Sequence, residues 1–340
     1  MLDEAIIPRL RLILLKPIFF PMQTRQPIHS FKASSRVSLV LALFLAAFSG
    51  SVRADETLFG YAYGAETLPK GRTEVVQTFG LRHGKGIGRY DALDLVTELE
   101  YALTDRLTLE GSLAAFRHNY AGLTATEAFP EDRKSTQFAG WNLGVKYMVL
   151  SPYKNVVGFA IIPEIERREV YRINGDRIRQ WSFETTFALQ KNFLDDTLIA
   201  VCNYTLELER RVTPGTPSEL EEEISHELNA GITYRFAPRW FAGLETRYQT
   251  DYVDVASDPD DGSVVFNRLN HVSLGKQFQY GWYAGPVLHY ASTRWWVTAG
   301  LLWQVRGAKD EDPAFADLGS RKHYEEHEDY HLRLKIGIPF

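Results

Sequence analysis

The chain lacks a long apolar run, although 45% of its 340 residues are apolar, and its mean hydropathy is only -0.24. A helix that crosses a bilayer needs roughly 18 to 20 consecutive apolar residues, so the sequence excludes a helical membrane protein. Cysteine is almost absent as well, because Cys202 stands alone and cannot form an internal disulfide. The fold is therefore not held by a disulfide framework.

The longest apolar run covers residues 37–48. The basic residues Lys32 and Arg36 precede it, and small residues up to Ala54 follow it. A basic flank, a short apolar stretch and a small-residue cleavage site together predict a secretory signal peptide that is cleaved after Ala54. A buried core helix is the alternative interpretation of this run. Met22 is an alternative start, because the region before the run is unusually long.

Acidic residues outnumber basic ones in the chain after the predicted cleavage site. The first 54 residues hold seven of the 38 Lys and Arg, but only two of the 43 Asp and Glu. The remaining chain is therefore acidic, whereas binding to a phosphate backbone needs a basic surface. Nucleic acid is not expected as a partner.

The last eleven residues alternate between two kinds of side chain, and the chain ends on Phe340. One face carries Tyr330, Leu332, Leu334, Ile336, Ile338 and Phe340, and the other carries His331, Arg333, Lys335 and Gly337. A strand with this alternation suits a wall between lipid and water. The segment resembles the insertion signal of Gram-negative outer-membrane β-barrels. This resemblance implies that Tyr330 and Phe340 form an assembly signal, with the barrel-assembly machinery as a partner.

Segments of about ten residues with alternating polarity recur along the rest of the chain. They cover residues 72–83, 92–103, 106–116, 137–150, 156–167, 180–191, 197–209, 223–236, 240–249, 282–290, 295–306 and 330–340. Short and long connections alternate between them, as they do in bacterial outer-membrane barrels. The pattern predicts an all-β fold, a transmembrane antiparallel up-and-down β-barrel of about 12 strands, with a range of roughly 10 to 14. A soluble β-sandwich is the alternative, but aromatic residues gather beside the short turns, as in an interfacial girdle.

Two features depart from regular strands. Pro163 and Pro286 lie inside predicted strands, where each removes a hydrogen-bond donor, so we expect an irregular wall at both positions. The connection at residues 250–281 is long enough for an additional hairpin, since residues 271–278 alternate weakly.

The predicted organisation has three parts. Residues 1–54 are an upstream extension with the signal peptide, residues 55–71 are a periplasmic or lumenal segment, and residues 72–340 are the barrel. The signal peptide takes the chain across the inner membrane, and the barrel lies in the cell outer membrane among lipids and lipopolysaccharide. Lipid is expected to face Leu95, Leu99, Leu143, Val145, Phe183, Phe187, Leu334 and Ile336.

The opposite face of each strand must line the lumen. The predicted lumen residues are Glu74, Asp94, Glu98, Glu100, Lys146, Glu164, Glu184, Glu207, Glu227, Arg247, His289, His331, Arg333 and Lys335. The last strand pairs with the first in a closed barrel, so the basic row from His331 to Lys335 is expected near Glu74 and Asp94. These charges either form paired locks in a filled lumen or line a polar conduit with opposed charges.

Catalytic and metal-binding patterns are weak. No Ser or Thr stands at a spacing from His and an acid that singles out a nucleophile. Residues 258–262 and 310–312 offer oxygen ligands without a complete spaced set, and the pair His323 and His327 lies in a connection, where helical spacing means little. The sequence therefore predicts no catalytic residue, no metal, no cofactor and no enzyme activity.

Residues 57–71, 101–107 and 285–290 resemble a family of uncharacterised outer-membrane barrels related to the outer-membrane proteins of a MetA-type phenol-degradation pathway. The resemblance covers most of the chain after the signal peptide and implies transport, but it brings no catalytic residues. The leading hypothesis is a channel for small solutes, including aromatic or other apolar compounds, through a charged lumen. The alternatives are a structural or surface-interaction barrel with a side-chain-filled lumen, and a barrel lipid hydrolase.

Overall fold

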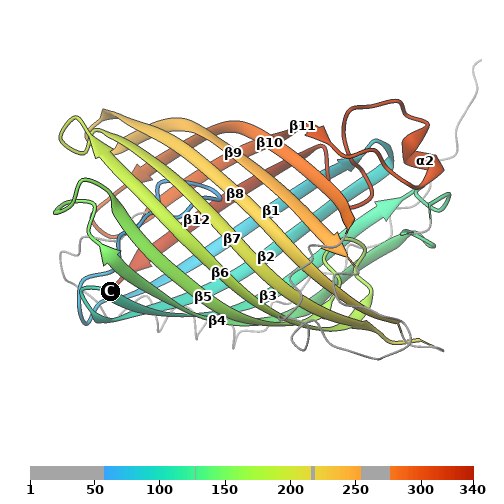
Figure 1. Cartoon of the computed structure of the whole chain (residues 1–340), viewed down its shortest axis with the longest axis horizontal. Helices are drawn as coiled ribbons and strands as arrows, with labels where there is room; N and C mark the ends of the chain where they lie inside the picture. The colour runs from blue at the N-terminus through green and yellow to red at the C-terminus, as the bar shows by residue number, and fades with distance from the viewer. Residues whose placement is uncertain (1–56, 127, 216–218, 254–275) are drawn as a thin grey trace, which may run out of the picture. The chain divides into compact units, whose positions relative to one another are not determined.

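The computed structural model describes residues 57–126, 128–215, 219–253 and 276–340. These residues form a closed barrel of antiparallel strands in which β1 pairs with β12 (Figure 1). The strands are β1 Thr73–Lys85, β2 Ile87–Thr104, β3 Leu107–Ala121, β4 Arg133–Leu150, β5 Gly158–Val170, β6 Arg177–Phe193, β7 Leu198–Thr213, β8 Glu219–Ala237, β9 Trp240–Val253, β10 Lys276–Ala291, β11 Trp296–Gly307 and β12 Tyr330–Pro339; the short helix α2 is Pro313–Ala316. The predicted all-β barrel of about 12 strands is confirmed. No helix in the described part of the chain is long and apolar enough to cross a membrane.

Both ends of the sheet meet where the chain closes the barrel. The amide of Phe340 donates to the Thr73 carbonyl at 2.8 Å, and the amide of Thr73 donates to the Phe340 carbonyl at 3.2 Å. We call this the terminal end of the barrel; Figure 1 shows it on the left, where the chain end is marked. The opposite end, which carries α2, is the loop end. The connections at the terminal end are two to seven residues long, whereas the loop end carries the connection of residues 308–329 as well as the single-residue turn at Gly86 between β1 and β2.

Each of the twelve predicted segments coincides with one strand, but several strands run further toward the loop end. Strand β7 continues to Thr213 and β9 to Val253, both four residues beyond the predicted ends. The backbone ladder continues there, although polar residues occupy both faces and the alternation is lost. The predicted signal peptide lies outside the described residues. Of the connection 250–281, in which an additional hairpin was considered, residues 250–253 and 276–281 belong to β9 and β10, and residues 254–275 lie outside the described residues.

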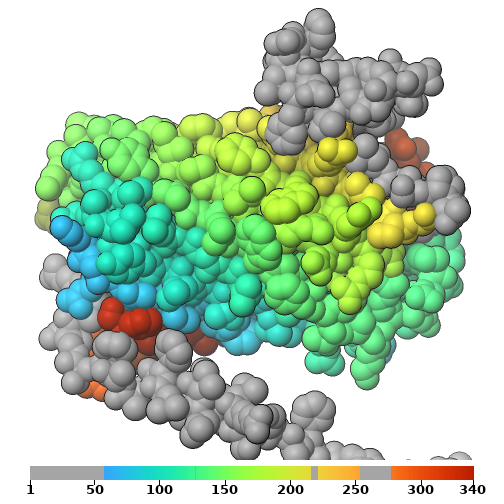
Figure 2. Space-filling view, turned by 90° about the horizontal axis from the view of Figure 1, so that it is seen from below, coloured from blue at the N-terminus to red at the C-terminus, as the bar shows by residue number. Residues whose placement is uncertain are grey.

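The outer face of the wall carries apolar side chains. Of the residues expected to face lipid, Leu99, Leu143, Phe183 and Phe187 are exposed on the barrel surface, and the others are partly exposed. Figure 2 shows one side of this wall, where side chains coloured from cyan to yellow-green pack beside one another. The described strands thus present the apolar exterior that a bilayer requires.

The wall is irregular at both prolines, as predicted. In the described ladders, Pro163 and Ile162 have no paired partner in β4, and Pro286 and Gly285 have none in β11. A Cβ at Gly285 would lie 1.8 Å from the carbonyl oxygen of Leu301, so this position requires glycine. A missing donor in each proline interrupts the ladder without opening the ring of strands.

Candidate functional site

Residues 57–68, the N-terminal segment, lie against the inner wall of the barrel. The amides of Gly60, Tyr61 and Ala62 all donate to the carboxylate of Glu245 in β9, at 2.9, 2.8 and 2.8 Å. A Cβ added to Gly60 would lie only 3.2 Å from the Cα of Gly300 in β11. One carboxylate and one close backbone approach therefore fix this segment to two strands.

Further along the N-terminal segment, side chains of the barrel wall form hydrogen bonds with its backbone groups. Asn203 of β7 accepts from the amide of Tyr63 at 2.6 Å and donates to its carbonyl at 3.0 Å. Gln190 of β6 accepts from the amide of Ala65 at 2.8 Å. Phe59 and Ala62 are buried in an apolar cluster with Ile199, Val201, Phe241 and Val287. Because its polar groups are paired and its apolar groups are buried, the segment is a built part of the lumen.

Ion pairs fasten connections at the loop end. We call residues 308–329 the long loop. Its residue Glu328 pairs with Arg82, with 2.8 Å between Glu328 Oε1 and Arg82 Nη1. Glu328 also contacts His331, with 2.8 Å between Glu328 Oε2 and His331 Nε2. Arg82 also pairs with Asp94 at 3.0 Å, and Asp94 receives Arg172 of the neighbouring connection at 3.1 Å. Two loop-end connections are thus held to the wall by one network of buried charge.

An apolar cluster lies beside this network at the loop end. Its buried members are Tyr90, Ala92, Tyr120, Leu123, Phe129, Ile173, Phe315 and Tyr324. The hydroxyl of Tyr90 donates to the Ile173 carbonyl at 2.7 Å, which ties β2 to the connection of residues 171–176. Burial of these aromatic rings stabilises the packing of the loop-end connections against the strands.

A cavity of 420 Å³ lies inside the barrel, and both the N-terminal segment and the long loop contribute to its lining. Of the fourteen predicted lumen residues, those that line it are Asp94, Glu98, Glu100, Lys146, Glu164, Glu184, Glu207, Glu227, Arg247, His331, Arg333 and Lys335. Glu74 and His289 lie elsewhere in the interior. Glu74 accepts a hydrogen bond from Trp296 Nε1 at 2.8 Å, and His289 Nδ1 lies 2.7 Å from Thr298 Oγ1.

Acidic and basic side chains are interspersed around the cavity. Glu164, Glu184 and Glu207 project from β5, β6 and β7, and Arg168 and Arg211 line the cavity from the same side of the ring. Arg333 and Lys335 project from β12, which is opposite β6 in the closed strand order. The lumen therefore offers charges of both signs to a solute.

The basic row contacts the N-terminal segment rather than the acids expected from sequence. The guanidinium carbon of Arg333 lies 4.0 Å from the ring centroid of Tyr61, and Lys335 Nζ lies 5.4 Å from that of Tyr63. In the register of β12 and β1, Arg333 stands opposite Gly80, so the row does lie beside the first strand. Asp94, however, takes its ion pairs from Arg82 and Arg172.

The predicted assembly residues lie at the two ends of the closing strand, with Tyr330 as its first residue and Phe340 just after its last. Phe340 makes the last pair of backbone hydrogen bonds at the terminal end. Tyr330 begins β12 at the loop end, where its ring stacks on His83 with centroids 4.8 Å apart. These positions bracket the seam between β12 and β1, and their role in assembly stays a prediction.

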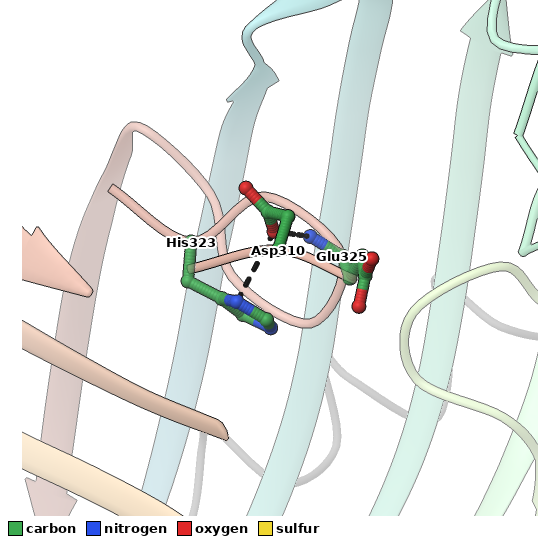
Figure 3. A group of neighbouring side chains, drawn as sticks. All are labelled: Asp310, His323 and Glu325. Carbon is green, nitrogen blue, oxygen red and sulfur yellow. Dashed lines mark hydrogen bonds and ion pairs between the residues drawn. The ribbon is translucent and has the colours of Figure 1, made fainter. Parts of the chain in front are cut away.

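A histidine and two carboxylates gather within the long loop. One ligand atom from each of Asp310, His323 and Glu325 lies within 4.8 Å of the other two, and Figure 3 shows the three side chains side by side. Burial and nearby Lys85 lower the pKa of His323 to about 4, although the Ala308 carbonyl raises it. Residues 310–312 and 323–327 are separate tracts in the sequence, and neither forms a complete ligand set by itself. Both belong to the connection between β11 and β12, and the folding of this connection brings them together.

The pair of His289 and Thr298 inside the barrel does not have the geometry of a hydrolytic centre. His289 Nδ1 lies beside Thr298 Oγ1, but that hydroxyl donates to the Thr57 carbonyl of the N-terminal segment. A nucleophile must instead be free to attack a substrate carbonyl. This pair therefore helps to seat the N-terminal segment.

No functionally curated protein matches the sequence. Among solved structures, the COG4313 outer membrane channel from Pseudomonas putida F1 is similar with a TM-score of 0.51 and 13% identity over 81% of this chain and 98% of that chain. LpxR from Salmonella typhimurium gives a TM-score of 0.41 and 9% identity over 78% of this chain and 99% of that chain. At 13% identity the first likeness shows a shared barrel fold alone. Residues 51–340 match the model of a family of unknown function, DUF6662, and the chain belongs to that family.

Proposed function

We propose that this protein is an outer-membrane channel for small polar solutes and that the N-terminal segment and the long loop close it at rest. The single observation that carries this proposal is the 420 Å³ interior cavity, which is lined by charged side chains and bounded by both of these segments. A barrel built only as a scaffold has no need of opposed charges around an interior space. A channel uses such charges to replace the hydration of a passing solute.

The cavity lining favours solutes that combine charge with an aromatic or otherwise flat part. Tyr61, Tyr63 and Phe116 line the cavity beside the acidic and basic side chains. An aromatic compound with polar groups fits this lining better than a purely apolar one, because an apolar solute would desolvate the wall charges. The resemblance to outer-membrane proteins of a phenol-degradation pathway supports the same class of solute within this proposal.

The apolar exterior supports a position in the outer membrane, in contact with its lipids and lipopolysaccharide. In bacterial barrels the short turns are periplasmic and the longer loops are outside. The terminal end is then periplasmic, and the long loop faces the exterior. The N-terminal segment, which follows the predicted signal peptide, enters the lumen from the periplasmic side.

Planar bilayers test this function against its alternatives. Purified protein should give stepwise openings, with a reversal potential in a salt gradient that reports a charged lumen. Permanent silence, together with retention of small charged dyes inside protein-containing liposomes, would contradict the proposal and support the side-chain-filled structural barrel. Hydrolysis of the bilayer lipids by the same preparation would support an enzyme, which the proposal does not expect.

A further inference from the structure

We propose that Asp310, His323 and Glu325 bind one divalent transition-metal ion of the zinc class and that this ion fastens the long loop. The three residues supply one imidazole nitrogen and carboxylate oxygens, which are the ligand types that zinc takes beside an open position. Asp310 precedes α2 and Glu325 follows it, so an ion bound to both would cross-link the two ends of the loop segment that contains this helix. The inference does not depend on the channel function.

The imidazole is the strongest indication of a ligand. His323 is only 1% exposed, and in the described part of the chain neither of its ring nitrogens makes a hydrogen bond of good geometry, although the nearby Ala308 carbonyl interacts with the ring. Its Nδ1 is nevertheless 3.1 Å from Asp310 Oδ1 (Figure 3). A buried imidazole with unsatisfied nitrogens is costly, unless its lone pair is used by a cation. The short separation of two ligand atoms that lack hydrogen-bond geometry is what a shared ion would produce.

Backbone hydrogen bonds orient each member of the set. Oδ1 of Asp310 accepts from the amides of Tyr324 and Glu325 at 2.7 and 3.0 Å. The carboxylate of Glu325 accepts from the amide of Asp312. The backbone of His323 is held on both sides by one side chain, because Gln304 accepts from its amide at 2.8 Å and donates to its carbonyl at 2.9 Å. Such outer contacts fix ligand orientation in metal sites.

The surrounding charge is compatible with a divalent cation. Lys85 donates to the Glu325 carbonyl at 3.0 Å, but its ammonium is also 3.7 Å from Glu328 Oε1, which supplies a separate countercharge. The carboxylates of Asp310 and Glu325 then remain to balance the charge of the bound ion. Calcium and magnesium prefer sites made of oxygen alone, so the imidazole favours zinc or a neighbouring transition metal.

Metal analysis of untagged, folded protein in detergent tests this site. After dialysis against Zn²⁺ and then metal-free buffer, we expect one zinc per wild-type chain, and the bound protein should resist protease cleavage within residues 308–329. His323→Ala should weaken zinc binding by more than about 100-fold and abolish the zinc-dependent protection. Glu311→Gln, at an exposed neighbouring acid, should bind zinc as wild type does.

Assembly of each variant is checked by its heat-modifiable mobility. If His323→Ala does not assemble, Glu325→Gln, which keeps the size of the side chain, replaces it in the same assay. Absence of zinc from the wild type would overturn the proposal, as would wild-type affinity in the His323 or Glu325 variant. Equal binding of Ca²⁺ would overturn the assignment to the zinc class.

Discussion

The Arg333 guanidinium on the closing strand lies over the ring of Tyr61 in the N-terminal segment, with 4.0 Å between its central carbon and the ring centroid. Arg247 of β9 lies 5.2 Å from the same centroid. Tyr61 thus contacts cations from two strands. Arg333, which the sequence assigned either to a paired lock or to the wall of a polar conduit, contacts the segment that narrows the lumen.

Arg333→Gln should loosen the N-terminal segment without unfolding the barrel. A cation–π contact is worth about 0.5 to 2 kcal/mol, less than the roughly 3 to 5 kcal/mol for breaking a buried ion pair. We expect a small fall in the heat-modifiability midpoint, longer openings in bilayers and a shift of the reversal potential toward cations, because a positive charge has left the wall. Arg333→Lys is the matched control, which keeps the charge but not the planar stacking. A variant with wild-type openings and selectivity would exclude this role.

Glu245→Gln should release the same segment by a different route. The carboxylate accepts three amides, and an amide side chain offers only one oxygen and no charge. Loss of hydrogen bonds to a charged group costs about 1.5 to 3 kcal/mol. Protease cleavage within residues 57–68 should become faster, whereas the exposed acid change Glu221→Gln should leave it unchanged. Equal protection in both variants would show that Glu245 does not hold the segment.

Acid should open the long loop through Glu328. Burial alone would raise the pKa of Glu328, but Lys85, Arg82 and the hydrogen bond from His331 hold it well below its usual range. A carboxyl with a lowered pKa adds stability above its ordinary pKa, and this stability is lost as the pH falls through the lowered value. Protection of residues 308–329 from limited proteolysis, with a neutral protease above pH 5 and pepsin below it, should therefore persist from neutral pH down to about 4.3 and decline below it.

Glu328→Gln separates this effect from general acid denaturation. It leaves Arg82 without a charged partner in the long loop, so the loop should already be cleaved at pH 7 and should lose the acid-dependent step. Glu311→Gln, in the same loop but exposed, should behave as wild type. Wild-type protection of the Glu328 variant at every pH would rule out the ion pair as the fastening.

Cysteine labelling tests the orientation of the wall. On a Cys202→Ser background, Leu99→Cys, Leu143→Cys and Phe183→Cys should react slowly with a water-soluble maleimide in liposomes, because lipid covers these positions. Ser320→Cys, exposed in the long loop, should react quickly. Equal rates at all four positions would contradict the membrane-spanning wall.

The barrel could be predicted because strand alternation and proline chemistry are local. The alternation of residues 330–340 is visible in the sequence, and β12 begins at Tyr330, as expected. Pro163 lacks a donor in any surroundings, so the interruption beside β4 also followed from sequence. Twelve of the fourteen predicted lumen residues line the cavity, since side-chain direction alternates along each strand.

The partners of the lumen charges could not be predicted, because they depend on segments that fold back into the barrel. Strand alternation places Arg82 on the inward face of the first strand, but it did not predict that Arg82 joins Asp94 to Glu328, because only the folded long loop brings Glu328 there. The meeting of Asp310 with His323 has the same cause. Residues 57–68 carry no alternation that would have assigned them to the lumen wall.

Single-channel conductance after deletion of residues 57–68 tests the central claim most directly. The deletion variant is first shown to assemble by its heat-modifiable mobility and is then compared with the wild type in the same bilayers. Removal of a segment that lines the cavity should increase the conductance and the open time, and a synthetic peptide of residues 57–70 added on the terminal side should reduce both again. An assembled deletion variant that stays silent, or conducts as the wild type does, would contradict a channel closed by its N-terminal segment.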